Sequence, residues 1–69
     1  MTLQDLIRNI RIKCDISQMI LSKWSKIDQT SISLYESGKR TGITLRRKQR
    51  LIDIANKKCS MKLKLNDIK

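Results

Sequence analysis

Histidine, phenylalanine and proline are absent from this 69-residue chain, which also has only two glycines, one tryptophan and one tyrosine. Without histidine, Cys14 and Cys59 have no neighbours at a zinc-ligand spacing, and a His-activated nucleophile cannot be built. A Gly-rich phosphate loop and paired carboxylates are lacking too. We therefore expect no enzyme, metal, cofactor or small-molecule substrate, and a core made of Ile, Leu and Met.

A long apolar run is also missing, and Gln4, Asp5 and Arg8 interrupt the first residues. Nothing in this pattern indicates secretion or a membrane span. No segment combines a large apolar face with a basic one, which disfavours a membrane partner. We expect a cytoplasmic, nucleoid-associated protein whose two cysteines are free thiols, although one disulfide between them is formally available.

Acidic residues are few: six Asp and Glu stand against sixteen Lys and Arg, which gives a formal net charge of +10. Such a charge favours a polyanion, either nucleic acid, an anionic membrane or an acidic protein. The length allows one small domain with a limited core, so dimerisation would add stability.

Apolar residues recur at helical spacing in four segments, 2–13, 17–24, 29–37 and 45–57. The expected fold class is all-α, a small bundle of four to five helices. We expect the second helix to bury Ile20 and Leu21, the third Ile32 and Tyr35, and the fourth a set that begins at Leu45. The helix starts are marked by the N-cap candidates Thr2, Ser17, Asp28 and Thr44. Gly38 marks the end of the third helix.

The C-terminal residues alternate instead, with Met61, Leu63 and Leu65 on one side and Lys62 and Lys64 on the other. A period of two predicts a strand, which needs a partner. Either this strand pairs with a second copy and forms a dimer interface, or it is a tail. The chain thus divides into a domain at 1–60 and a dimerisation element or tail at 61–69.

Residues 7–40 resemble the Xre family of Cro- and lambda-repressor-like helix-turn-helix domains. The resemblance rests on Arg11, on Ile16-Ser17-Gln18 at the start of the second helix, and on ISLYESGKR at 32–40. Two positions depart from the family. Lys26 stands where the turn usually has Gly, and Ser25 replaces a buried apolar residue, so we expect Trp24 to cover the core there.

The resemblance implies that the helix at 29–37 reads bases in the major groove, where amides and hydroxyls match the donors and acceptors of base edges. The candidate base contacts are Gln29, Thr30, Ser33 and Leu34. The candidate phosphate contacts are Gln18, Ser31, Lys39, Arg40, Lys26, Arg46 and Arg47. Arg11 and Glu36 are expected to form a structural ion pair.

The function these features predict is sequence-specific binding of double-stranded DNA by a homodimeric transcriptional regulator, a repressor in the first instance. The C-terminal pattern is similar to that of HipB-like antitoxins, which would imply a cognate toxin partner, and a phage-type repressor fits equally well. The alternative is a protein-interaction module whose basic surface binds an acidic protein, with DNA binding secondary.

Overall fold

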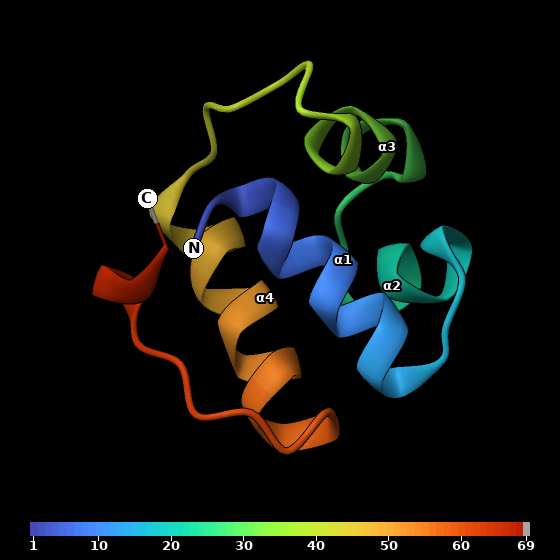
Figure 1. Ribbon diagram of the computed structural model, residues 1–69. Helices are drawn as coiled ribbons and strands as arrows, with labels where there is room; N and C mark the ends of the chain where they lie inside the picture. The colour runs from blue at the N-terminus through green and yellow to red at the C-terminus, as the bar shows by residue number, and fades with distance from the viewer. Residues whose placement is uncertain (69) are drawn as a thin grey trace.

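The computed structural model describes residues 1–68, which form four α-helices and one short 3₁₀ turn. The helices are α1 (Leu3–Cys14), α2 (Gln18–Ser25), α3 (Gln29–Ser37) and α4 (Leu45–Lys58), and the 3₁₀ turn is η1 (Leu65–Asp67). In Figure 1, α1 crosses the front of the bundle; α1 and α2 each pack against both α3 and α4. The all-α class is confirmed, and the helix bounds lie within a residue of those predicted.

Local side-chain caps explain where each helix begins. Thr2 accepts from the Asp5 amide while Asp5 accepts from the Thr2 amide, which makes a capping box. Ser17, Asp28 and Thr44 cap α2, α3 and α4, as the sequence predicted, and each accepts from the backbone amide three residues later. Gly38 ends α3 with φ of +81°, a conformation that costs glycine little.

The core is aliphatic and joins all four helices. Its fully buried side chains include Leu6, Ile7, Ile10, Leu21, Ile27, Ile32, Leu51 and Ile52. Two burial predictions are wrong: Ile20 is 38% exposed and Leu45 is 71% exposed. Ile20 lies one helical step from Leu21, on the rim of α2, and Leu45 is the first residue of α4, beyond the reach of α1. No helix within residues 1–68 has the length and apolar character that a bilayer crossing requires.

The connection between α2 and α3 keeps a regular left-handed turn without glycine. Lys26 adopts φ 58° and ψ 29°, the αL conformation that the resemblance assigns to this position. Ser25 is fully buried, and its hydroxyl donates to the Leu21 carbonyl and accepts from the Ile27 amide. Because Ser25 is satisfied inside the core, Trp24 is not needed there. The expectation that Trp24 covers the core is wrong, since its side chain is 38% exposed.

The two cysteines are not free thiols. Cys14 at the end of α1 and Cys59 after α4 form a disulfide, with their Cα atoms 5.4 Å apart. Their separation of 45 positions gives no local signal of this proximity, because only the packing of α1 against α4 brings the two helix ends together. The expectation of free thiols is therefore corrected.

Residues 1–68 contain no strand, and the alternating segment packs along its own chain. Met61 and Leu63 lie half-buried against the core, whereas Leu65 is 37% exposed. The Asn56 side chain bonds both backbone groups of Leu63, accepting from its amide at 2.8 Å and donating to its carbonyl at 3.0 Å. The predicted strand is thus absent from the single chain, because Asn56 occupies the backbone groups that a ladder would use. Its pairing with a second copy stays a prediction.

Candidate nucleic-acid interface

One face of α3 is polar and open to solvent. Burial of Ile32 and Tyr35 on the opposite side turns Gln29, Thr30 and Ser33 outward, with Leu34 half-buried beside them. Together with Gln18 from the first turn of α2, these four residues line a shallow depression. The structure therefore brings together all four predicted base-contact residues and one predicted phosphate contact.

Ser31 does not belong to this face. It is 4% exposed, although the sequence placed it outward as a phosphate contact. Its hydroxyl donates to Asp28 at 2.8 Å and accepts from Arg40 Nη1 at 2.8 Å, so it ties the start of α3 to the loop that follows the helix. The Ser31 amide, and then the Ser31 hydroxyl, lower the pKa of Asp28 by donating to its carboxylate. Ser31 is thus a structural residue.

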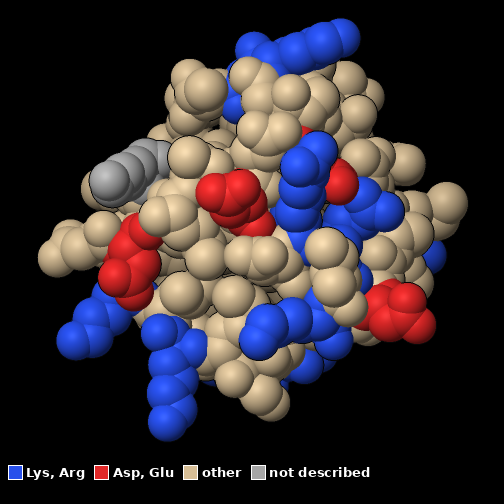
Figure 2. All heavy atoms as spheres, in the orientation of Figure 1, with Lys and Arg blue, Asp and Glu red and all other residues tan. Residues whose placement is uncertain are grey.

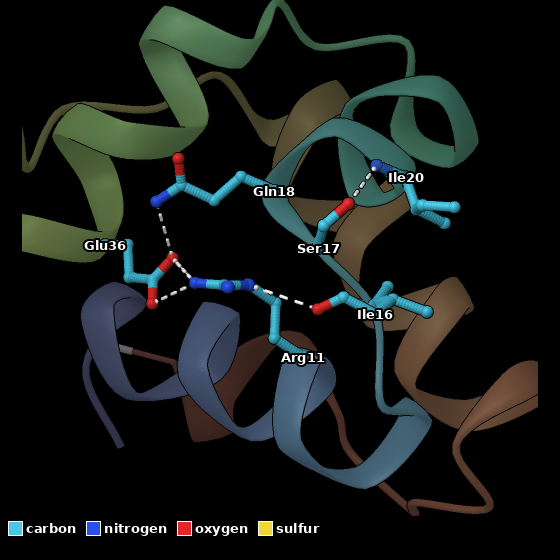
Figure 3. A network of polar contacts seen from close by, with 6 residues as sticks. All are labelled: Arg11, Ile16, Ser17, Gln18, Ile20 and Glu36. Atoms are coloured by element: carbon cyan, nitrogen blue, oxygen red, sulfur yellow. Dashed lines mark hydrogen bonds and ion pairs between the residues drawn. The ribbon is translucent and has the colours of Figure 1, made fainter.

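A polar network fixes the angle between α1, α2 and α3 (Figure 3). Arg11 Nη1 donates to both carboxylate oxygens of Glu36, at 2.5 and 2.6 Å, so the ion pair predicted from the sequence is present. Gln18 Nε2 donates to the same carboxylate at 2.9 Å. Arg11 Nε donates to the Ile16 carbonyl at 3.3 Å, which ties the turn between α1 and α2 to the network. The Glu36 carboxylate therefore links α3 to both α1 and α2.

The Glu36 carboxylate is held in its charged form. Its burial alone would raise the pKa, but hydrogen bonds from Arg11 and Gln18 and the positive charges of Arg11 and Arg8 outweigh burial. The net effect is a pKa below the ordinary value of 4.5. At neutral pH the carboxylate is therefore charged and can keep both partners in place.

Positive side chains stand at both ends of α3. Lys26 precedes the helix, and Lys39 and Arg40 follow it, all three exposed. Arg40 lies over the Tyr35 ring, 5.8 Å from its centroid, and Arg47 Nη1 is 3.5 Å from the Tyr35 hydroxyl. Arg40 and Arg47 therefore gather beside α3, although they come from the loop and from α4. Arg46 is exposed on the first turn of α4, with no hydrogen bond to α3.

On the face of the molecule that Figure 1 shows, charge is spread out rather than gathered in one stripe. Figure 2 shows Lys and Arg side chains at the top, middle and bottom of the face seen in Figure 1, with Asp and Glu side chains among them. Among residues 1–68 no group of three His, Cys, Asp or Glu side chains is placed to hold a metal ion. The distinguishing feature of the α3 surface is thus the polar row between its flanking cations.

Three contacts between different elements were not predicted from the sequence. These are the Gln18–Glu36 bond, the Arg40–Ser31 bond and the stacking of Lys58 on Trp24, with Nζ 4.8 Å from the ring centroid. Each joins residues from different elements, so no local spacing signals it. The Asp28-x-x-Ser31 spacing at the start of α3 was a usable signal, because a serine three residues after an Asx cap can bond the capping carboxylate.

Comparisons of the chain with protein-family models, with curated proteins and with solved structures found no match.

Proposed function

We propose that this chain binds double-stranded DNA at specific sequences, with α2 and α3 as a helix-turn-helix of the Xre type. The observation that carries the proposal is the solvent-facing row of Gln29, Thr30 and Ser33 on α3, a helix that the Arg11–Glu36 pair ties to α1. A short polar helix held rigidly with its polar row outward suits the major groove, which admits an α-helix.

The side chains of this row match the chemistry of base edges. An amide such as Gln29 can pair in two places with adenine, and the hydroxyls of Thr30 and Ser33 can donate or accept. Leu34 at the floor of the depression offers an apolar surface to a thymine methyl group. These four residues would provide the sequence preference.

Affinity would come from phosphate contacts, which position the protein but carry no sequence information. Gln18 lies in the first turn of α2, and Lys26, Lys39 and Arg40 flank α3. Arg47, beside Tyr35, is a further candidate, and Arg46 a more distant one. Replacing Lys39 with Ala should weaken binding to all sequences alike and reduce the salt slope by about one.

The biological role we propose is that of a dimeric transcriptional regulator, a repressor that occupies a pseudo-palindromic operator. Half-sites would then lie about one helical turn, or roughly 10 bp, apart. A HipB-like antitoxin, whose toxin would be a second partner, and a phage-type repressor are both consistent with this proposal. Met61 and Leu63, two of the predicted interface residues, are half-buried against the core of their own chain, so they would have to leave it to pair with a second copy.

The test is selection from a pool of random duplexes, followed by sequencing of the bound molecules. The native chain should enrich a two-fold symmetric motif, and Gln29→Ala should change the preferred base at one position of each half-site. Gln49→Ala is the matched control, because Gln49 is an exposed amide on α4 that bonds only Asp53. Binding without any enriched motif would refute sequence-specific recognition.

A second candidate function, binding of an acidic protein, is favoured by one observation. Met19, Ile20 and Trp24 are exposed apolar residues on α2, and the nearby side chains of Lys23 and Lys58 are exposed. An exposed tryptophan among apolar residues is typical of protein contact surfaces, and the adjacent lysines would suit an acidic partner. If this surface binds the main partner, Trp24→Ala should abolish that interaction, whereas Gln29→Ala should leave it unchanged.

A further inference from the structure

The disulfide lies next to the network that orients α3. Cys14 is the last residue of α1, and Asp15 and Ile16 follow it in the turn to α2. Asp15 adopts a left-handed conformation, with φ of 54°. The Ile16 amide donates to the Arg11 carbonyl at 3.0 Å, and the Ile16 carbonyl accepts from Arg11 Nε at 3.3 Å. The turn that the disulfide anchors is thus bonded to the same arginine that holds Glu36.

The anchoring is covalent on one side only. Cys59 joins the turn to the end of α4, whereas the remaining contacts of the turn are hydrogen bonds and the packing of the half-buried Ile16 against the core. Without the covalent link, the end of α1 can fray, because the last turn of a helix has unsatisfied carbonyls and few buried contacts. Fraying at Cys14 would displace Ile16 and remove one of the bonds that orient the Arg11 guanidinium.

We propose that Cys14 and Cys59 form a reversible redox site that controls DNA binding: the disulfide holds α3 in its reading orientation, and reduction releases it. The inference rests on the proposed DNA-binding function. The co-reactant is a dithiol, of the class that thioredoxin-like proteins and small reductants provide. No part of the base-reading row needs to change chemically for affinity to change.

The exchange balances in two steps. Cys14 is half-exposed and Cys59 is 8% exposed, so a thiolate of the dithiol attacks the Cys14 sulfur, and Cys59 leaves as a thiolate. The second thiolate of the dithiol then attacks the dithiol sulfur that is bonded to Cys14. The dithiol closes to a disulfide, and Cys14 leaves as a thiolate. The dithiol loses two electrons and becomes a disulfide, and the two cysteines gain them and take up two protons.

The experiment measures affinity for the duplex selected by the oxidised full-length chain, before and after treatment with dithiothreitol and again after reoxidation. Reduction should weaken binding about tenfold, a typical coupling between two sites, and reoxidation should restore it. The double variant Cys14→Ser, Cys59→Ala should have the same affinity for the duplex as the reduced chain, and dithiothreitol should not change that affinity. Asn56→Ala, which loosens the tail beyond Cys59 but leaves the disulfide, should keep the response.

Two structural readouts separate the outcomes. Hydrogen exchange of the Ile16 amide should speed up on reduction, while far-UV circular dichroism keeps its helical intensity. Equal affinity in both redox states would overturn the inference and leave the proposed function standing. Loss of all helical signal on reduction would also overturn it, because the disulfide would then only sustain the whole fold. Absence of DNA binding in the oxidised chain would overturn the proposed function, and the inference with it.

Discussion

Arg11 on α1 and Glu36 on α3 form a two-point ion pair across 25 positions of sequence, and Gln18 on α2 donates to the same carboxylate. The pair is partly sheltered, with 30% of the Arg11 side chain and 17% of the Glu36 side chain exposed. The network in Figure 3 joins α3 to α1 and α2, and it therefore sets how the polar row of α3 faces a ligand. Four predictions follow from this arrangement and from the turns around it.

Glu36→Gln should lower the free energy of unfolding by about 1–3 kcal/mol. The variant leaves the Arg11 guanidinium without its carboxylate, and solvent at the half-exposed site moderates the cost. Urea unfolding measures the change. Asp53→Asn is the control, because the exposed Asp53 accepts only from Gln49, and its effect should stay within about 0.5 kcal/mol. Equal losses in the two variants would show that the pair contributes nothing special.

Acid should remove the stabilisation that Glu36 provides. The pKa of Glu36 is lower in the folded chain than its ordinary value of 4.5, so the unfolded chain takes up the proton first. The stabilisation is therefore fully present above that value and is lost as the pH falls through the lower, folded pKa. The difference in unfolding free energy between the native chain and Glu36→Gln should shrink as the pH falls from about 5 through the folded pKa of Glu36. A difference that is independent of pH contradicts the assignment.

Lys26→Gly should stabilise the fold while weakening DNA binding. Lys26 holds φ of 58°, which costs a side chain with Cβ about 1–2 kcal/mol, and glycine avoids most of that strain against its own entropy cost of about 0.5–1 kcal/mol. We expect a gain of up to about 1 kcal/mol in thermal unfolding and a salt slope lower by about one. Lys23→Gly, inside α2, should instead lose about 1 kcal/mol.

Asn56→Ala should release the C-terminal segment from α4. The variant loses two hydrogen bonds to Leu63, worth about 1–2 kcal/mol in total, and frees that backbone for other partners. If residues 61–65 pair between copies, sedimentation should show a tighter dimer for Asn56→Ala than for the control Asn66→Ala, whose side chain is exposed in η1. A monomer in both variants would place the dimer interface elsewhere.

Features set by local chemistry could be predicted from the sequence. The four N-caps, Gly38 and the helix bounds depend on residues a few positions apart, and the outward row of α3 follows from burial of Ile32 and Tyr35. The left-handed conformation of Lys26 was not predicted, because a side chain with Cβ stands where the resemblance has glycine.

Features set by packing between elements could not be predicted. Whether Ile20 or Ser25 faces the core depends on the roll of α2, which hydrophobic spacing does not fix to one residue. The sequence predicted an exposed Ser31, yet Ser31 is buried and its hydroxyl accepts from the Arg40 side chain. The disulfide depends on how α1 lies against α4, and the hydrogen bond from the Leu63 amide to Asn56 depends on how residues 61–68 lie against α4.

The most direct test of the central claim is an NMR titration that maps which amide signals of the isotopically labelled chain shift when the selected duplex is added. We expect the largest shifts for Gln18 and for residues 29–34, with smaller ones for Lys26, Lys39 and Arg40. The amide signals of the C-terminal half of α4 and of residues 61–68 should not shift. Shifts centred on Trp24 and Lys58, with residues 29–34 unmoved, would contradict the claim that α3 reads DNA.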